Sequence, residues 1–405
     1  MKAQSTLANE QNKKHFSNRN PLRDFSSSNI STGIISGMLA MTGPPAIILE
    51  AASAGGFSNE QTISWMFAVY FFGGIFGILF PLIYKIPITG AHSLSGVAFL
   101  VTITPYYSFP ELVAAYIIAG AIIFIIGITG LFSKIMKWFP KEIIAAMLGG
   151  LITTYVVRLV VSIQDLAIVG IPAIISFFIF TKWVKRVPAV LGAVLTALVM
   201  VLITQDISGI STGVDYVFPS IYKLDFTLMG VFTISIPLAL LILSNDAAPG
   251  IGALESERYD PPTGKIITAS GFFTMIAGLF GGQSANIAGM MSAICADDQA
   301  GKKEKRYIAA LVSGVLLLLF GIFAWKIVRF IQILPDSFIA MLAGFALIGM
   351  LGSSVQQGFS EKRFRLGSTF AFVITLSDIS FYYISAPVIG LVVGSFISKV
   401  IENKD

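Results

Sequence analysis

Long runs of apolar residues dominate the chain, and short polar or glycine- and proline-rich stretches separate them. A helix needs about 20 mostly apolar residues to cross a bilayer. The pattern predicts an all-α polytopic membrane protein with fourteen transmembrane segments, several of them too short to cross unaided. They lie at residues 29–54, 62–85, 89–104, 109–138, 140–161, 164–182, 187–205, 227–256, 264–280, 282–297, 304–330, 335–356, 366–381 and 384–401.

Composition supports this reading and excludes several other classes. Mean hydropathy is +0.82 and 12% of residues are charged, against about 25% in soluble domains, so the lipid bilayer is an expected partner. The net charge of +5 does not indicate nucleic-acid binding, because the basic residues are spread over short loops. The single cysteine, Cys295, excludes an internal disulfide and a cysteine-based metal cluster. We expect no metal and no cofactor.

The distribution of basic residues predicts the orientation. If both termini are cytoplasmic, all but four of the 27 lysines and arginines fall on the inside, as the positive-inside rule requires. The four on the outside are Arg158, Lys223, Lys326 and Arg329. We expect a multi-pass protein of the bacterial cytoplasmic membrane. Residues 1–28 are polar and basic, without the apolar core of a signal peptide, and we expect a disordered cytoplasmic tail.

Short stretches of similar text occur in the same order in both halves of the chain. An odd number of spans in each half, seven, requires the second copy to be inverted, which is common in secondary transporters. We expect a first repeat at 29–205, an extracytoplasmic linker at 206–226 and a second repeat at 227–403. The paired stretches are 140–150 with 335–344, 90–93 with 281–284, and 187–192 with 386–390.

The third and tenth segments are short and open with residues that disfavour helix, at 87–102 and 280–295. Each predicts an extended stretch followed by a half-helix, and extended backbone at that depth must line a cavity or lie buried in protein. Two facing half-helix N-termini form an anion site. We expect residues 91–93 and 283–285 to lie within about 10 Å of each other. Alternatively, Gly and Ser here only let helices pack closely. The candidate substrate ligands are His92, Ser93, Gln283, Ser284 and Asn286.

The first and eighth segments carry predicted breaks at their midpoints, at residues 41–45 and 244–250. Proline frees carbonyl groups of the preceding turn, which leaves acceptors near a bound ligand. These breaks add Thr42, Pro44, Asn245 and Asp246 to the candidate substrate-binding residues.

Asp246 is the one acid placed so centrally in an apolar segment. Acidic residues are costly in a membrane and usually mark a pathway or a coupling site. A carboxyl group removed from water favours its neutral form, so Asp246 is the leading candidate for proton coupling. His92 is the second candidate, because histidine suits the same task. The alternative for Asp246 is a structural hydrogen bond to a neighbouring helix.

Several motifs together resemble those of the benzoate/proton symporter family (BenE type). They are residues 127–132, 146–151, 248–254, 259–262 and 281–295. The resemblance implies the fold of the nucleobase/ascorbate and sulfate-type anion transporters, with two inverted repeats of seven segments. It implies a core domain (29–138 and 227–330) and a gate domain (139–205 and 331–403), and a substrate site between segments 3 and 10, against segments 8 and 1. Where that family carries amides, this chain has Asp246, so a bound anion requires that carboxyl to be protonated or ion-paired.

These observations favour a secondary active transporter that takes up a small organic anion, a benzoate-like aromatic carboxylate, by alternating access with the proton gradient as energy source. The core is expected to move against the gate, and a homodimer is expected through the gate domains.

A nucleobase symporter and an inorganic anion transporter of the same fold are the alternatives. A channel would need a continuous polar stripe. An intramembrane hydrolase with Ser93 or Ser95 as nucleophile lacks a separate base, so we do not expect an enzyme. Coupling to sodium and the roles of Glu50 and Asp378 stay open.

Overall fold

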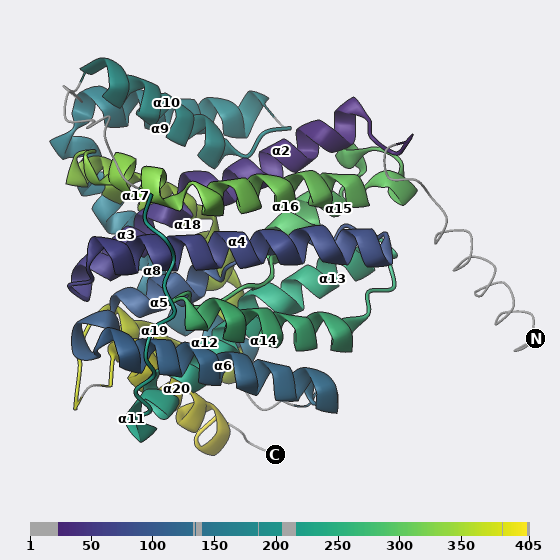
Figure 1. Ribbon diagram of the computed structural model, residues 1–405. Helices are drawn as coiled ribbons and strands as arrows, with labels where there is room; N and C mark the ends of the chain where they lie inside the picture. The colour runs from purple at the N-terminus through teal and green to yellow at the C-terminus, as the bar shows by residue number, and fades with distance from the viewer. Residues whose placement is uncertain are drawn as a thin grey trace, which may run out of the picture.

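The computed structural model describes residues 23–132, 134, 140–184, 186–204, 216–382 and 384–402. Long helices lie side by side and run along one common direction, with α4, α6, α14 and α16 forming one side of the bundle (Figure 1). Within the described part, seven helices are long and apolar enough to cross a membrane, and four shorter apolar helices accompany them. The chain is therefore a helical membrane protein with multiple spans, and the count of fourteen stays a prediction.

The described residues of the first half of the chain include eight α-helices, one short strand and one 3-10 turn. Their bounds are α2 (Ser27–Thr42), α3 (Pro44–Ala54), α4 (Asn59–Tyr84), β1 (Gly90–Ala91), α5 (Leu94–Val101), η2 (Thr104–Tyr106), α6 (Phe109–Thr129), α8 (Lys141–Asp165), α9 (Ala167–Trp183) and α10 (Ala189–Thr204).

The described residues of the second half include α-helices, one short strand and more short helical turns than the first half. Their bounds are α11 (Leu228–Gly230), η3 (Val231–Ser235), α12 (Ile236–Leu241), η4 (Ile242–Ala247), α13 (Ala248–Ser256), α14 (Thr263–Leu279), β2 (Asn286–Ile287), α15 (Gly289–Ala296), η5 (Asp298–Ala300), η6 (Lys303–Lys305), α16 (Tyr307–Ile322), α17 (Ala324–Gln332), α18 (Asp336–Gly358), η7 (Lys362–Phe364), α19 (Arg365–Leu376) and α20 (Ala386–Val400).

Glycine allows helices far apart in the sequence to pack backbone against backbone. A Cβ atom added at Gly314 of α16 would lie 2.6 Å from the carbonyl carbon of Gly77 in α4. One added at Gly271 of α14 would lie 2.2 Å from the backbone nitrogen of Phe124 in α6. Small residues at such crossings are what membrane helices use to approach closely. Glycine therefore allows the close packing of α16 on α4 and of α14 on α6.

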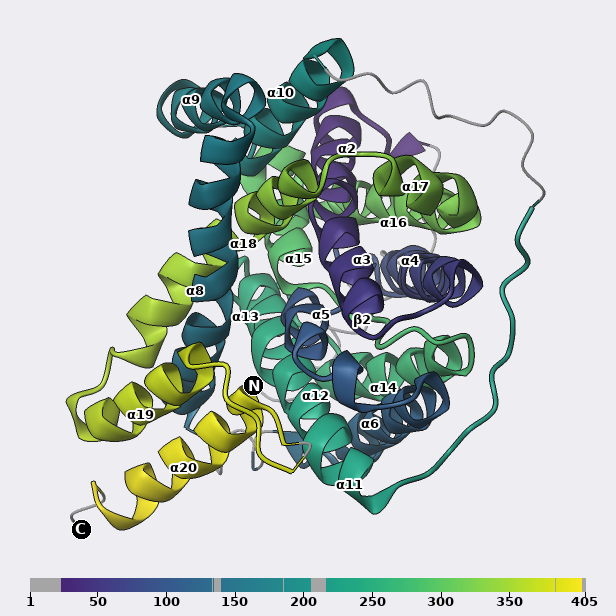
Figure 2. The ribbon, with the colours of Figure 1, turned by 90° about the vertical axis from the view of Figure 1, so that its left-hand side faces the viewer.

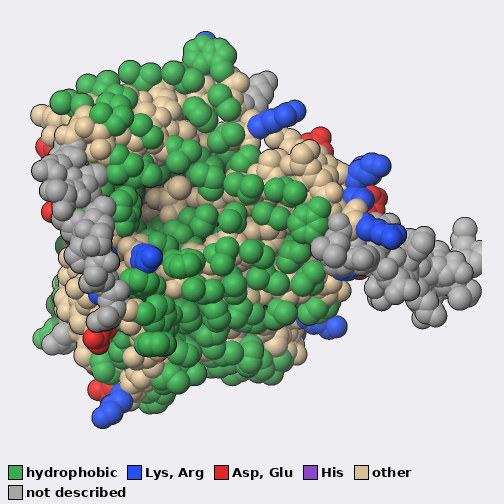
Figure 3. Space-filling model, turned by 45° about the horizontal axis from the view of Figure 1, so that its top comes forward, with side chains coloured by type: hydrophobic (Ala, Val, Ile, Leu, Met, Phe, Trp, Pro, Cys, Tyr) green, Lys and Arg blue, Asp and Glu red, His purple; other side chains and the backbone are tan. Residues whose placement is uncertain are grey.

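Apolar and basic side chains occupy different parts of the surface of the bundle. Hydrophobic side chains cover the long face, and Lys and Arg gather mainly at the end where α2 begins (Figure 3). Lys303, Lys305 and Arg306, which precede α16, lie at this end. The opposite end holds the start of α4 and the end of α3. This asymmetry fits a bundle that crosses a membrane along its helix axes.

The tail is ordered from Asp24, so the expected disorder up to residue 28 is wrong for this part. The buried carboxylate of Asp24 accepts a hydrogen bond from the Tyr307 hydroxyl at 2.8 Å and forms an ion pair with Lys305 at 3.0 Å. Helix α2 then begins at Ser27, capped by Ser26. These contacts hold residues 24–28 against α16. Residues 1–22 of the expected tail lie outside the described residues.

The break expected at residues 244–250 is also wrong. The chain continues as helix, and residues 242–247 adopt a π-helical form in which the backbone N–H of Ala248 donates to Leu243. Because Pro249 has no N–H, one carbonyl of the preceding turn loses its backbone donor. This does not interrupt the helix, which widens to π-helical geometry immediately before the proline. The expected segment 304–330 also differs, because it is divided into α16 and α17 at Phe323.

The polar stretch between the halves is partly described. Residues 216–226 are irregular and pass along the outside of the bundle to α11 (Figure 2). The backbone N–H of Tyr222 donates to Leu279 at 3.1 Å, and that of Asp225 to Pro110 at 3.2 Å. These bonds attach the end of the linker to α14 and α6. Residues 206–215 of the expected linker lie outside the described residues.

Candidate functional site

Two broken segments cross in the middle of the bundle, as their glycine-rich openings predict. Strands β1 and β2 pair antiparallel, with Gly90 opposite Ile287 and Ala91 opposite Asn286. Each strand is followed by a half-helix of eight residues, α5 or α15. In Figure 2, α5 and β2 lie centrally, between α3 and α12. Among the described residues, this pair of two-residue strands forms the one sheet of the fold, and it brings the two half-helix N-termini together.

Local sequence explains why the chain is extended here. A Cβ atom added at Gly90 would lie 2.3 Å from the carbonyl oxygen of Gly73 in α4, so α4 passes too close for any side chain. Thr89 makes four hydrogen-bond contacts with the other segment, one of them between its hydroxyl and the Ser292 hydroxyl at 2.8 Å. Its backbone N–H donates to the Ser292 hydroxyl at 3.1 Å, its hydroxyl donates to the Ala288 carbonyl at 3.1 Å, and its carbonyl accepts from Ala288 at 3.0 Å.

Three of the predicted site residues hold the crossing together. The backbone N–H of Ser93 donates to the Ser284 hydroxyl at 2.8 Å. The Gln283 amide donates to the Ser93 carbonyl at 3.5 Å and accepts a hydrogen bond from the Trp65 indole. The Ser93 hydroxyl caps α5 by accepting from Gly96 at 3.1 Å. All three predicted residues are fully buried, and their polar groups are largely committed to the protein.

The first helix break lies beside His92. Helix α2 ends at Thr42, and α3 begins with Pro44 and Pro45. Because Pro44 has no N–H, the carbonyl of Ala40 loses its helical donor, and the Tyr70 hydroxyl donates to that carbonyl instead at 2.6 Å. The Tyr70 ring contacts His92 edge to face, with centroids 4.9 Å apart. Tyr70 thus links the break in α2–α3 to the start of α5.

Asp246 lies on the π-helical segment next to the tenth segment. A Cβ atom added at Gly289, the first residue of α15, would lie 3.0 Å from the Asp246 carbonyl oxygen. The side chains of Ser93 and Asn286 approach the Asp246 carboxylate. The Asn286 amide donates to the Ile287 carbonyl at 2.8 Å. Asn245 is turned to its neighbour, with its amide donating to the Ser244 hydroxyl at 3.1 Å.

Four predicted residues carry buried polar atoms that have no hydrogen-bond partner in the described part of the chain. They come from four different segments: Thr42 Oγ1, both ring nitrogens of His92, Asp246 Oδ2 and Asn286 Oδ1. Buried polar groups are normally paired, and exceptions call for an explanation such as a ligand or water. Together these atoms offer a carboxyl, an imidazole, a hydroxyl and an amide oxygen, which can accept and donate hydrogen bonds and exchange protons.

Sequence reasoning missed residues whose roles depend on packing. Trp65 and Thr89 contact the crossing through hydrogen bonds to partners 218 and 199 residues away. Tyr70 contacts it through its ring, which lies against His92. In the sequence, Tyr70 and Trp65 belong to an unbroken aromatic and apolar run, 65–72. No signal there distinguishes them from residues that face lipid. Thr89 lies within the predicted opening, so the polar residue before Gly90 could have been included.

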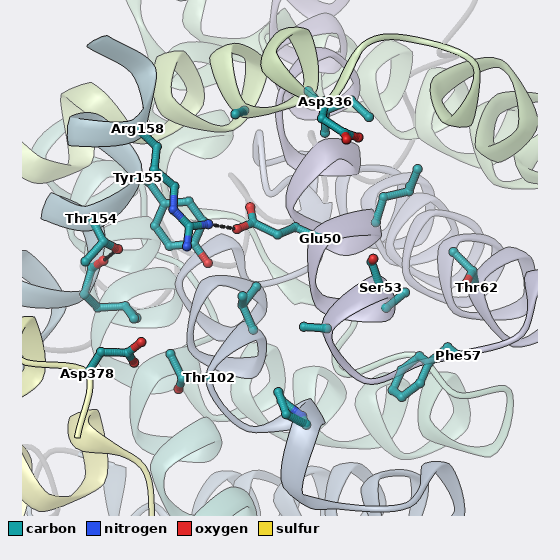
Figure 4. Close-up of a pocket in the computed structure, with 18 of the residues that line it drawn as sticks. Glu50, Ser53, Phe57, Thr62, Thr102, Thr154, Tyr155, Arg158, Asp336 and Asp378 are labelled. Atoms are coloured by element: carbon teal, nitrogen blue, oxygen red, sulfur yellow. Dashed lines mark hydrogen bonds and ion pairs between the residues drawn. The ribbon is translucent and has the colours of Figure 1, made fainter. Parts of the chain in front are cut away.

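A large cavity lies apart from this crossing. It has a volume of about 840 Å³ and lies among α3, the end of α5, η2, α8 and α18. The lining residues labelled in Figure 4 include Glu50, Phe57, Thr102, Tyr155 and Arg158. None of the nine predicted site residues is among its described lining. Because α5 has eight residues, its two ends are about 12 Å apart, and the cavity and the crossing lie at opposite ends of this helix.

A bundle of membrane-length helices with two crossed half-helices at its centre is the architecture of a class of membrane transporters. Solved structures of such transporters match the fold of this chain. The fold matches the transmembrane domain of a cyanobacterium bicarbonate transporter, BicA, with a TM-score of 0.57, 14% identity, and coverage of 91% of this chain and 97% of that chain. It also matches the murine Solute Carrier 26 family member A9 anion transporter in the inward-facing state, with a TM-score of 0.59, 14% identity, and coverage of 93% and 68%. The chain thus has the fold of anion transporters.

The family follows from sequence. Residues 23–400 match the family model described as benzoate membrane transport protein (BenE), and the chain belongs to this family. It is 28% identical over 373 residues to the benzoate membrane transport protein of Acinetobacter baylyi, covering 92% of this chain and 94% of that protein. It is 30% identical over 364 residues to the inner membrane protein YdcO of Escherichia coli, covering 89% and 93%. The resemblance seen in the motifs is confirmed, and the family is one of transporters, not enzymes.

Proposed function

We propose that this protein takes up a small organic anion, a benzoate-like aromatic carboxylate, across the bacterial inner membrane in symport with protons. The observation that carries the proposal is the set of unpartnered buried atoms on Thr42, His92, Asp246 and Asn286 around the crossing of the half-helices. Family membership and the names of the relatives in Acinetobacter baylyi and Escherichia coli support the substrate class and the location.

The half-helix α15 supplies a feature suited to an anion. Its N-cap residue, Ala288, provides no side-chain hydrogen bond, so the first N–H groups of the helix keep their partial positive charge for a ligand. Asp246 lies against the first residue of this helix. An ionised Asp246 would repel a carboxylate, whereas a protonated one can donate a hydrogen bond to it. Substrate and proton are therefore bound together, and each raises the affinity for the other.

The proposal includes the architecture expected from the sequence. Fourteen segments form two inverted repeats, with a core at 29–138 and 227–330, a gate at 139–205 and 331–403, and both termini in the cytoplasm. The crowding of Lys and Arg at the end where α2 begins supports this orientation. The large cavity then faces the extracytoplasmic side and lies between the core helices α3 and α5 and the gate helices α8 and α18. We infer alternating access through motion of the core against the gate, and a dimer formed by the gate domains.

The test is uptake of radiolabelled benzoate into proteoliposomes that contain the purified protein. Uptake above equilibrium is expected with an acidic exterior and an alkaline interior, and it should collapse when a protonophore removes the pH gradient. A sodium gradient alone should not drive it. Uracil, bicarbonate and sulfate are tested in parallel. If one of these accumulates and benzoate does not, the proposed substrate class is wrong.

A further inference from the structure

We propose that Arg158 is a docking point for the substrate carboxylate in the extracytoplasmic cavity, separate from the central crossing, and that Glu50 competes with the substrate for it. The proposal rests on the proposed function, because it concerns an organic anion on its way to the central site. It assigns a role to a cavity that the nine predicted residues do not reach.

The geometry of Arg158 leaves most of its binding capacity open. One guanidinium nitrogen, Nη1, forms an ion pair with Glu50 Oε1 at 2.6 Å. The Arg158 side chain is 65% exposed and that of Glu50 is 23% exposed. Arg158 projects from α8 across the cavity toward Glu50 on α3 (Figure 4). A guanidinium has five N–H donors in a planar fork that suits a carboxylate. The side chain can therefore bind a second carboxylate or exchange the first.

The charges that line the cavity make Arg158 its one attractive point for an anion. Among the described residues of the lining, Arg158 is the sole Lys or Arg, and the carboxyl groups belong to Glu50, Asp336 and Asp378. With all three ionised, the carboxylates outnumber the guanidinium, so an entering anion is repelled except close to Arg158. Screening in salt limits each charge to about 8 Å, which makes the local contact with Arg158 more important than the net charge.

The surroundings of Arg158 also fit an aromatic acid. Tyr155 lies one helical turn before Arg158 on the same helix and lines the same cavity (Figure 4). Leu49 and Phe57 contribute apolar surface to the same cavity. Its volume of about 840 Å³ lies within the range of about 300–1,000 Å³ typical of small-molecule sites. A carboxylate on Arg158 would leave the ring of the substrate near these apolar side chains.

A competing role for the same ion pair is a latch between core and gate, since it joins α3 to α8. The two roles predict different effects of removing each partner. A latch is lost equally when either residue is neutralised. A docking site is lost when Arg158 is neutralised. Its affinity for the substrate rises when Glu50 is neutralised, because the guanidinium then has no competing carboxylate at this ion pair.

The experiment measures the initial rate of benzoate uptake against benzoate concentration in proteoliposomes for the wild type, Arg158→Gln and Glu50→Gln. We expect Arg158→Gln to raise KM roughly tenfold and Glu50→Gln to lower it roughly threefold, as suits one charged hydrogen bond. Arg158→Lys should fall between wild type and Arg158→Gln. Lys223→Gln is the matched control, because Lys223 is exposed at the same end and is not among the cavity lining, and its KM should not change.

The outcomes distinguish a failure of the docking role from a failure of the proposed function. Wild-type uptake of benzoate tests the proposed function, whereas the opposite shifts of KM in the two variants test the docking role. If both variants change KM or the maximal rate in the same direction, the pair is a latch and the docking proposal is wrong. Unchanged KM in both also overturns it. If Arg158→Gln fails to fold, as seen by size-exclusion chromatography, the lowered KM of Glu50→Gln still decides the question.

Discussion

The backbone N–H of Ser93 and the hydroxyl of Ser284 are joined by a hydrogen bond of 2.8 Å between residues 191 positions apart. This bond connects the turn that opens α5 to the segment that leads into β2. The neighbouring strand pair contributes few backbone hydrogen bonds, because each strand has only two residues. The relative position of the two half-helices, and so of the N-termini that face the candidate site, therefore depends on side-chain hydrogen bonds such as this one.

Ser284→Ala removes the acceptor and leaves the buried N–H of Ser93 unpaired. An unsatisfied buried donor costs about 1–3 kcal/mol, so we expect a lower thermal unfolding midpoint in detergent. The matched control is Ser313→Ala, because Ser313 is equally buried but makes a longer hydroxyl–hydroxyl contact of 3.4 Å with Ser36. Equal midpoints for the two variants would show that the Ser93–Ser284 bond does not stabilise the crossing.

Tyr70→Phe removes the hydroxyl that satisfies the Ala40 carbonyl while keeping the ring against His92. The free energy of unfolding should fall by about 1–3 kcal/mol because the carbonyl is left unpaired. The cause is Pro44, and Gly43 keeps nearly helical backbone angles (φ −105°, ψ −49°). In a Pro44→Ala background the new N–H can bond Ala40, so Tyr70→Phe should cost less there. Identical costs in both backgrounds would contradict this account.

Gly90→Ala places a methyl group where α4 crosses β1. The added Cβ would lie 2.3 Å from Gly73 and 2.6 Å from Gly77, and both contacts are with backbone, which cannot move aside cheaply. Overpacking of this kind costs about 1–3 kcal/mol or more, and we expect loss of the monodisperse protein. Gly252→Ala in α13 is the control, because nothing lies within 4 Å of its added Cβ. Equal yields of both variants would show that the crossing is not tight.

Some breaks in the helices could be predicted from sequence because they depend on local backbone chemistry. Two prolines follow Gly43, and Gly90 and Gly281 open the broken segments, so the interruptions at these places appear in the residues themselves. Asp246 could be chosen because an acid in an apolar run is unusual. Membership of the family and the helical membrane fold also followed from such patterns, and the structure and the comparisons agree with them.

Other features depend on partners that sequence does not reveal. The eighth segment has the same proline signal as the first, yet it stays continuous and adopts a π-helical form at residues 242–247. Glu50 and Arg158 are 108 residues apart and their pairing depends on how α3 meets α8. Gln283 and Ser284 looked like ligands, but their polar groups are bonded to Trp65 and Ser93.

The proposed boundary between core and gate predicts that a cross-link across it stops transport. Glu50→Cys and Arg158→Cys, in a Cys295→Ser background, place thiols on α3 and α8 at the cavity. A flexible bifunctional thiol reagent should join them and abolish the benzoate uptake that the double-cysteine variant retains before cross-linking, with no further change in its benzoate binding in detergent. Cleavage of the linker by a reductant should restore uptake.

A control cross-link within the gate checks that prediction. Gly149 of α8 and Val355 of α18 are in contact, with 3.6 Å between an added Cβ and the Val355 methyl group. Cysteines at these two positions should form a disulfide without loss of uptake, since both helices belong to the proposed gate. Full uptake with the α3–α8 link closed would place the moving boundary elsewhere.

Asp246→Asn tests the coupling. The amide keeps the shape and hydrogen-bonding capacity of the carboxyl group but cannot gain or lose a proton. Wild-type uptake should rise as the exterior is acidified, because a proton must be bound on that side together with the anion. In Asp246→Asn, benzoate binding should persist and uptake should no longer depend on external pH or exceed equilibrium. The measurement is the inside-to-outside benzoate ratio reached at steady state across a series of external pH values, with the interior pH fixed.

Two further variants separate coupling from general damage. Asp225→Asn changes the same residue type at an exposed position of the linker, and its pH profile should match the wild type. His92→Asn removes the other proton-exchanging side chain with unpartnered buried atoms. If Asp246→Asn still accumulates benzoate against its gradient while His92→Asn does not, the coupling role belongs to His92 and the carboxyl of Asp246 is structural. Because the side chains of Ser93 and Asn286 approach this carboxyl, a structural role would then appear as a lowered unfolding midpoint of Asp246→Asn.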